Sequence, residues 1–330
     1  MSVVDFASQA VNYFLREGDG IPVAPIDHPA AWHGTDLAAD ADRWLVRLSA
    51  EAVAQLGRSA DTLLAERVPL DEVTAARFDV AGLEASIAEW RATLAKGAGV
   101  VCLRGLPVRE WGEEKSALVY WGLGHHLGSP GAQNPQGELL GHVKNYDEQS
   151  DSPLVRLYRT ADEIAFHCDA ADVVGLLCVR TAAEGGQSRI ASSVAVFNEV
   201  LRRRPDIATE LFEPFHVDRR DEQAPGEPPT FELAPCAFHE GVLRTFWHSD
   251  YMRSAGRHAG IEISERRLEL FDLYDEIAGS EPFRFDMWLQ EGDIQLISNH
   301  SVVHARTGYT DHADVEERRH LLRLWLSLGA

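Results

Sequence analysis

The sequence contains little cysteine, which limits the redox and metal chemistry that it can support. Only 4 cysteines occur in 330 residues, and they are Cys102, Cys168, Cys178 and Cys236. No two of them form a C-x-x-C pair, which argues against a zinc site built from thiolates. Their neighbours are mostly apolar, as is typical of buried, reduced thiols in a cytosolic protein. We therefore expect a cytoplasmic location.

Positive charge and long apolar segments are also scarce. Lys and Arg number 31 against 52 Asp and Glu, which gives a formal net charge of -21. This balance makes nucleic acid and anionic membranes unfavourable partners. No stretch reaches the roughly 18 apolar residues that a membrane span requires, and residues 1–20 lack the basic start of a signal peptide. We expect a small-molecule partner, and the sequence leaves homo-oligomerisation open.

The order of the predicted elements excludes a dinucleotide-binding fold. There is no G-x-G-x-x-G and no alternation of strands with helices. The spacing of apolar residues predicts strands over 100–103, 164–169, 173–179, 188–191, 237–238, 243–247, 293–298, 302–304 and 320–328. It predicts helices over 83–96, 113–127, 194–201, 205–211 and 264–277. Such strands with inserted helices favour a mixed α+β fold whose core is an antiparallel barrel or jelly roll.

Residues 1–80 are expected to form an irregular, then helical, N-terminal extension. Within it, Trp44, Leu45, Leu48, Val53 and Leu56 recur at helical spacing. We find no internal repeat and no convincing linker. The whole chain, 1–330, is therefore predicted to be one domain.

A histidine and an aspartate two residues apart occur four times. The pairs are His167/Asp169, His216/Asp218, His248/Asp250 and His312/Asp314. In a strand such a pair points to one side of the sheet, because side chains alternate. Only the first pair lies in a strand whose opposite face is apolar, formed by Ile164, Phe166 and Cys168. The alternative to metal binding is a hydrogen bond between His167 and Asp169 in the core.

The C-terminal region contains a distant histidine followed by two arginines. His304 follows an apolar strand, and Arg319 and Arg323 are four residues apart, so they lie on one face of the last strand. Guanidinium groups directed inward need anionic partners. These partners are either a bound anion or acidic side chains of the protein. Two histidines and one carboxylate match the facial triad of non-haem Fe(II) oxygenases.

Five motifs in this order resemble one known family. They are Phe166-His167-Cys168-Asp169, Gly185-Gly186-Gln187-Ser188, Gly292-Asp293, Asn299…His304-Ala305-Arg306 and Arg319-x-x-x-Arg323. Together they resemble the Fe(II)- and 2-oxoglutarate-dependent dioxygenases of the TauD/TfdA type, including the clavaminate-synthase-like members. The resemblance covers roughly residues 98–328. It implies that this segment forms a double-stranded β-helix, or jelly roll, with flanking and inserted helices.

The resemblance also implies the cofactors and the residues that hold them. His167, Asp169 and His304 correspond to the iron ligands, and no further catalytic residue is implied. Ser188 and Arg319 correspond to the groups that bind the distal carboxylate of 2-oxoglutarate, while Arg323 lies near its C1 carboxylate. Arg319 follows His304 by 15 residues (319 − 304), a longer separation than in the taurine enzyme, so Arg318 competes for this role.

The reaction implied by the resemblance is the oxidation of an unactivated C–H bond by O2, with release of succinate and CO2. Hydroxylation is favoured, and desaturation remains open. Asp169 occupies the position where related halogenases have a small residue, which disfavours halogenation. The competing interpretations are a non-catalytic metal-binding jelly roll and a zinc-dependent hydrolase that uses the same ligands. Neither of these needs a clamp for a dicarboxylate.

The substrate is the least specified part of the prediction. The candidate contacts, each with a structural alternative as a loop or core residue, are Asn145, Tyr146, Arg219, Arg220, Trp247 and His248. A cationic pocket lined by aromatic residues would suit a small carboxylate or an amino-acid-like molecule.

Overall fold

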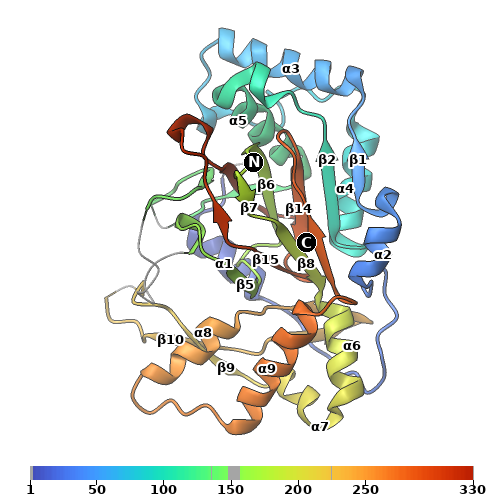
Figure 1. Cartoon of the computed structure of the whole chain (residues 1–330), viewed down its shortest axis with the longest axis vertical. Coiled ribbons are helices and arrows are strands. Elements are labelled where there is room, and N and C mark those ends of the chain that lie inside the picture. The colour runs from blue at the N-terminus through green and yellow to red at the C-terminus, as the bar shows by residue number, and fades with distance from the viewer. Residues whose placement is uncertain (1–2, 135, 148–156, 224, 330) are drawn as a thin grey trace.

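Two sheets packed face to face form the centre of the protein. The computed structural model describes residues 3–134, 136–147, 157–223 and 225–329 (Figure 1). The larger sheet has the order β1 (Leu45–Arg47), β2 (Val100–Arg104), β14 (Ile294–Ser298), β6 (Val173–Arg180), β17 (His320–Ser327) and β3 (Ser129–Gly131), and β4 (Gly141–Val143) also pairs with β17. The smaller sheet has the order β13 (Arg284–Met287), β8 (Ser188–Ser192), β15 (Val302–Arg306) and β5 (Ile164–His167).

The two sheets share an apolar core that lies between them, as in a jelly roll. Val174, Ile297 and Trp325 of the larger sheet are buried in one cluster with Ile190 and Val302 of the smaller sheet. Neighbouring strands are antiparallel, except for β1 beside β2. The predicted fold class, a mixed α+β protein with a jelly-roll core, is confirmed.

Helices cover the outer faces of both sheets. Against the larger sheet pack α4 (Glu84–Lys96) and α5 (Val108–Leu127), and α3 (Ala50–Ala65) packs on α5. Leu322, Leu324 and Leu326 of β17 are buried in the same apolar cluster as these helices. Against the smaller sheet pack α6 (Ser193–Arg203) and α9 (Glu265–Gly279), with α7 (Pro205–Ala208) beside them (Figure 1). Among the described residues, no helix has the length and apolar character needed to cross a bilayer.

The remaining elements are short. Besides several 3-10 turns, they are α1 (Phe6–Phe14), α2 (Gly34–Ala39), α8 (Ser249–Ser254) and three antiparallel strand pairs. The pairs are β9 (Phe215–Asp218) with β10 (Thr230–Leu233), β11 (Cys236–His239) with β12 (Val242–Thr245), and β7 (Glu184–Gly185) with β16 (Tyr309–Thr310). The N-terminal segment is tied to the core by Tyr13, whose hydroxyl lies 3.0 Å from the carbonyl oxygens of Thr245 and Asn299.

The structure corrects one prediction for the N-terminal extension. The apolar spacing from Trp44 onward predicted a continuous helix, but Leu45–Arg47 is strand β1, and α3 begins only at Ala50. The Trp44–Leu48 segment extends because it pairs along β2, with Leu45 opposite Cys102. Tertiary pairing thus outweighs local periodicity here. The assignment of the chain to a single domain stays a prediction.

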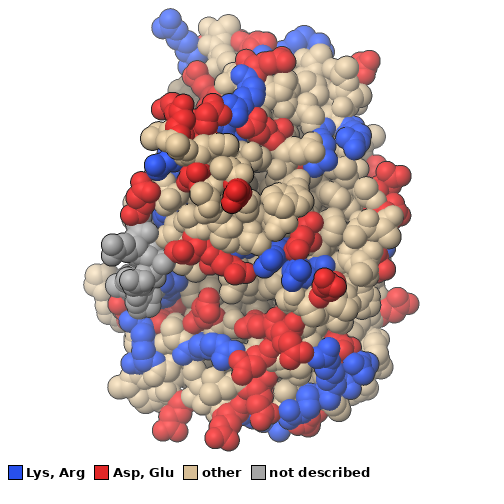
Figure 2. Space-filling view, in the orientation of Figure 1, with Lys and Arg blue, Asp and Glu red and all other residues tan. Residues whose placement is uncertain are grey.

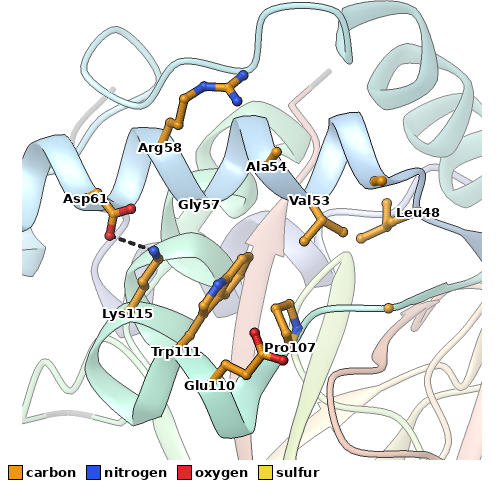
Figure 3. Close-up of a pocket in the computed structure, with 12 residues that line it drawn as sticks. Leu48, Val53, Ala54, Gly57, Arg58, Asp61, Pro107, Glu110, Trp111 and Lys115 are labelled. Atoms are coloured by element: carbon orange, nitrogen blue, oxygen red, sulfur yellow. Dashed lines mark hydrogen bonds and ion pairs between the residues drawn. The ribbon is translucent and has the colours of Figure 1, made fainter.

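The helices α3 and α5 lie side by side and leave a surface groove between them (Figure 3). The Lys115 ammonium of α5 lies 2.6 Å from the Asp61 carboxylate of α3 and 5.2 Å from the centre of the Trp111 ring. The groove is lined by residues of α3, α5 and their adjoining turns, so it belongs to the helical layer and not to the jelly-roll interior.

Charges of both signs are interspersed on the surface shown in Figure 2. The run Arg202-Arg203-Arg204 is an example, because acidic side chains neutralise it. Arg202 and Arg203 both bond Glu199, and Arg204 bonds Asp206 and Glu269. This run is therefore part of a surface ion-pair network and not a basic patch.

A buried ion pair joins the ends of β2 and β14. The Nε and Nη2 atoms of Arg104 donate to the two carboxylate oxygens of Asp293 at 2.8 and 2.6 Å, and Asp293 has no exposed surface. The preceding Gly292 has φ of 85°, and a Cβ there would lie 1.9 Å from the carbonyl oxygen of Leu106. Gly292 and Asp293 are therefore required by this turn for structural reasons.

We expect Asp293→Asn to lower the free energy of unfolding by about 3 kcal/mol, because it leaves the Arg104 charge without its buried partner. Urea denaturation would measure this change. The matched control is Glu291→Gln, which removes the neighbouring but exposed pair with Arg109 and should cost less than about 1 kcal/mol. Equal losses in the two variants would contradict the structural role of Asp293.

Candidate metal centre

Three side chains in and beside the smaller sheet converge on one point. His167 ends β5, Asp169 follows two residues later, and His304 lies in β15 directly opposite His167. The Nε2 atom of His167 is 4.0 Å from Oδ1 of Asp169, and Nε2 of His304 is 3.8 Å from Oδ2. These separations exceed hydrogen-bond length, so the three groups surround a space. This set, called the triad below, can hold one metal ion.

Neighbouring groups fix the orientation of the triad. The Nδ1 atom of His167 donates to the carbonyl oxygen of Ala165 at 2.9 Å, which orients the ring so that Nε2 is the nitrogen on the side of Asp169. The backbone N–H of Asp169 donates to Oδ1 of Asn299 at 3.1 Å. The indole Nε1 of Trp325 donates to Oδ2 of Asp169 at 2.9 Å. These partners position the ligand atoms as metal-binding proteins commonly do.

The protonation states of Asp169 and His304 suit metal binding. Burial alone would raise the pKa of Asp169, but the charges of Arg323, His304 and His167 and the Trp325 hydrogen bond lower it to about 2. Burial, followed by the neighbouring His167, lowers the pKa of His304 to about 3. At neutral pH, therefore, Asp169 is a carboxylate and His304 is a neutral imidazole with a free lone pair, as ligation requires.

Arg323 lies beside the triad on β17. Its Nη1 atom is 3.9 Å from Oδ1 of Asp169, and its Nε donates to Oε1 of Gln133 at 3.0 Å. The guanidinium lies 4.4 Å from the Trp325 ring centre and 4.9 Å from that of Tyr158. Arg323 is thus held rigidly by a hydrogen bond and two aromatic rings, with one nitrogen toward the metal ligands.

Arg319 is a buried cation whose charge is not paired within the described part of the chain. It is 5% exposed, and its Nη1 has no hydrogen-bond partner among the described residues. Burial lowers its pKa, so the charge is held there at a free-energy cost. Gly186, at φ of 70°, makes room for it, because a Cβ there would lie 3.0 Å from Arg319 Nε.

A second buried guanidinium lies close to Arg319. Arg306 of β15 donates through Nη2 to the carbonyl oxygens of Thr160, at 2.9 Å, and Asp162. The ring centre of Tyr309 lies 4.8 Å from the Arg306 guanidinium and 4.9 Å from that of Arg319. Burial, and then the charge of Arg319, lower the pKa of Arg306 to about 10. Two such cations favour binding of an anionic group next to Tyr309.

Ser188 and Arg318 differ in their surroundings. Ser188 lies on β8 opposite Arg306 and is buried, and its hydroxyl donates to Oε1 of Gln295 at 2.9 Å. Arg318 is partly exposed, and its Nη1 lies 3.2 Å from the carboxylate of Asp147. The side chain directed into the interior is therefore that of Arg319, while Arg318 takes part in a surface ion pair.

Among the substrate candidates, His248 lies nearest to the triad by the ring distances. Its backbone bridges to His167, and the two ring centres are 5.3 Å apart. The His248 ring stacks on Tyr251 with a centroid distance of 3.5 Å, and the Arg220 guanidinium lies 4.9 Å from the Tyr251 ring centre. Burial lowers the pKa of His248 well below its usual value. Arg220, Tyr251 and His248 thus form a column that ends at the triad.

The other candidates have different environments. Trp247 is buried in the core beneath the smaller sheet, where its indole donates to Asp275 at 2.8 Å, so it does not line the site. Arg219 lies 5.1 Å from the Phe231 ring centre. Asn145 closes a turn with Asp147, and Tyr146 contacts the Arg159 guanidinium at 4.0 Å. Both precede residues 148–156, which lie outside the described part.

Sequence reasoning missed three groups around the triad. Trp325 was detectable, because alternation along β17 places it on the same face as Arg319 and Arg323. Gln133 and Arg306 carried no comparable signal. Gln133 lies in a loop, and Arg306 was noted only as part of a motif.

Comparisons with known proteins agree with this geometry. A family model described as "Taurine catabolism dioxygenase TauD, TfdA family" matches residues 66–325. FR-33289 synthase of Streptomyces rubellomurinus is 28% identical over 92% of this chain and 91% of that protein. A taurine hydroxylase-like protein, SAT17, of Stachybotrys chartarum is 28% identical over 68% of this chain and 60% of that protein.

Solved structures share the fold. An asparagine oxygenase in complex with Fe(II), 2S,3S-3-hydroxyasparagine and succinate superposes with a TM-score of 0.69, at 18% identity over 86% of this chain and 94% of that chain. The non-heme iron oxygenase OrfP in complex with Fe and alpha-ketoglutaric acid gives a TM-score of 0.64, at 15% identity and with the same shares of the two chains. At these identities the likeness establishes the architecture alone.

We expect Trp325→Phe to weaken Fe(II) binding about tenfold or more, because Asp169 loses the hydrogen bond that orients it while the ring that covers Arg323 is retained. Anaerobic titration calorimetry would measure the affinity. Trp288→Phe is the control, because Trp288 is 62% exposed and should leave the affinity unchanged. An unaltered affinity in Trp325→Phe would show that the indole does not orient the carboxylate.

Proposed function

Because the chain belongs to the taurine catabolism dioxygenase TauD, TfdA family, we propose that its triad and its buried arginines carry out the reaction of this family on a small anionic molecule. The enzyme is a 2-oxoglutarate-dependent dioxygenase, and its cofactors are Fe(II) and 2-oxoglutarate. The observation that carries the proposal is the position of Arg319, a buried cation in the same interior as a triad able to hold a metal.

His167, Asp169 and His304 would hold the iron. The fit rests on two Nε2 atoms and one carboxylate that surround a space, with Asp169 ionised and the imidazole of His304 neutral at physiological pH. Iron bound there would couple the decarboxylation of 2-oxoglutarate by O2, which yields succinate and CO2, to the oxidation of a C–H bond. The protein's own task is to position substrate and co-substrate and to exclude water.

Arg319 would bind the distal carboxylate of 2-oxoglutarate, with the hydroxyl of Ser188 as a second contact. The free Nη1 of Arg319 supplies a charge-assisted donor, and Arg306 adds positive potential on the same aromatic ring, Tyr309. Arg323 would lie near the C1 carboxylate, because its guanidinium approaches Asp169. A dicarboxylate held at both ends would compensate charges that the protein leaves buried.

The substrate would lie against the column of Arg220, Tyr251 and His248, which reaches His167. A cation above stacked rings suits a small carboxylate or an amino-acid-like molecule. Asn145, Tyr146 and Arg219 stay candidates for outer contacts. Trp247 does not, because its side chain faces the core. Asp169 completes the ligand set, which disfavours halogenation. Hydroxylation is proposed as the main outcome, and desaturation is the alternative.

A hydrolase is disfavoured by the same observation that supports the oxygenase. Hydrolysis at a metal needs no dicarboxylate, so it would leave Arg319 and Arg306 buried without an anion. A non-catalytic metal protein would likewise gain nothing from this arrangement.

We expect Arg319→Ala to weaken 2-oxoglutarate binding about 100-fold, since hydrogen bonds to a charged group contribute about 1.5–3 kcal/mol each. Arg318→Ala is the matched control, because the neighbouring arginine forms a surface pair with Asp147 and should leave the affinity nearly unchanged. The measurement is anaerobic titration of the iron-loaded protein with 2-oxoglutarate. The reverse order of effects would transfer the role to Arg318.

The function itself is tested by screening small carboxylates and amino acids for succinate formation that depends on 2-oxoglutarate, with the product mass recorded. Gain of one oxygen would indicate hydroxylation, and loss of two hydrogens would indicate desaturation. His167→Ala should abolish both turnover and the visible charge-transfer band of the anaerobic complex with Fe(II) and 2-oxoglutarate. Wild-type protein that binds zinc but shows no such band would argue against the oxygenase.

A further inference from the structure

We propose that Glu113, His142 and His320 form a second cation site, outside the triad, for one Zn2+ or a similar divalent ion. One potential ligand atom from each of these residues lies within 4.8 Å of the other two. They come from three elements, α5, β4 and β17, that are far apart in the sequence. Two imidazoles and one carboxylate form a ligand set that zinc accepts in proteins.

The site lies on the face of the larger sheet that is opposite to Arg319. On β17, His320 alternates with Arg319, and it shares its face with Leu322 and Leu324, which pack under α5. His142 pairs across the strands with Leu322 and therefore projects to this same helical side. Glu113 reaches the cluster from α5. The cluster thus closes the end of the apolar layer between helix and sheet, where solvent has access.

The two imidazoles already face each other through their nitrogens. Nδ1 of His142 lies 2.8 Å from Nε2 of His320, and the ring planes differ by only 21°. This arrangement shares one proton between two lone pairs, and the same lone pairs can bind one cation. Tetrahedral zinc, with Zn–N bonds of about 2.0–2.1 Å, places its ligands roughly 3.3 Å apart. The rings would therefore separate by roughly 0.5 Å.

The exposure of the three residues permits this adjustment and the entry of an ion. The side chains of His142 and Glu113 are 37% and 44% exposed, whereas that of His320 is 3% exposed. His320 would be the fixed ligand, and His142 and Glu113 would move toward the ion. Glu113 is within reach, since its Oε1 lies 4.0 Å from Nδ1 of His142 and its Oε2 lies 3.4 Å from Nδ1 of His320.

His320 is surrounded by the positive charges of Arg180, Lys144 and Arg319. These cationic surroundings oppose the binding of a divalent ion, so the affinity should be moderate compared with a structural zinc site.

Arg180 is the group that competes with the ion. Its Nη2 lies 3.3 Å from Nδ1 of His320 and 3.9 Å from Oε2 of Glu113. The guanidinium of Arg180 therefore supplies positive charge to the same side chains that would bind the metal ion. Its Nε also contacts the carbonyl oxygen of Arg318 at 3.3 Å. Removal of Arg180 should therefore strengthen metal binding. A cluster that only served as a hydrogen-bond network would gain no zinc affinity from that change.

The test counts zinc ions per chain in the full-length metal-free protein by titration calorimetry with ZnCl2. We expect two ions for wild type, one for His142→Ala, one for His167→Ala/His304→Ala, and none when all three substitutions are combined. His216→Ala is the matched control, because this half-exposed histidine also lies near a glutamate, and it should retain two ions. Thermal melting checks the fold of each variant. If the variants without His304 fail to fold, wild type and His142→Ala still test the proposal, because it predicts two zinc ions per chain for wild type and one for His142→Ala.

Affinity changes at the second site provide an independent measurement. Glu113→Gln should weaken it about 10- to 100-fold, and Arg180→Ala should strengthen it severalfold. One zinc per wild-type chain, or two in His142→Ala, would overturn the proposal. Unchanged or weaker binding in Arg180→Ala would also overturn it and leave a proton-sharing histidine pair.

Discussion

The carboxylate of Asp169 is the group on which the rest of the site depends, because side chains from both sheets meet on it. Trp325 and Arg323 approach from β17, while His304 approaches from β15. A buried carboxylate is costly unless neighbouring charges and donors compensate it. Packing of the two sheets therefore provides these partners, and loss of the interface would disperse them. The fold and the metal site are in this sense one arrangement, and a metal ion bound to the triad would reinforce it.

Strand β17 connects three features through the simple alternation of its side chains. One face carries Arg319, Arg323 and Trp325 toward the interior between the sheets, and the other carries Leu322 and the polar His320 toward α5. His320 and Arg319 are adjacent in the chain, so a single peptide unit separates the two sides of the sheet at this point. Events on the helical side of the sheet are thus physically close to the arginine that we assign to the co-substrate.

The sequence could predict the elements whose signal is local. The succession of strands along the chain and the shared face of Arg319 and Arg323 follow from the periodicity of the side chains, and the predicted fold class is confirmed. The sequence could not predict features that depend on pairing between segments far apart in the chain. The spacing around Trp44 is compatible with a helix, and only the edge of β2 makes it a strand. Trp247 and His248 are adjacent, yet one enters the core and the other approaches the triad, because the Trp247 carbonyl accepts from Cys168 N–H.

Position of charge, and not its total, determines which ligand the interior can accept. The chain carries a net charge of -21, yet two buried guanidiniums next to Tyr309 form no ion pair among the described residues. The surface run from Arg202 to Arg204, by contrast, is paired directly with acidic side chains. Burial of unpaired cations destabilises the folded protein, and binding of a ligand that neutralises these charges compensates that cost. An anionic co-substrate would therefore stabilise the folded enzyme as it binds, whereas an apolar ligand could not.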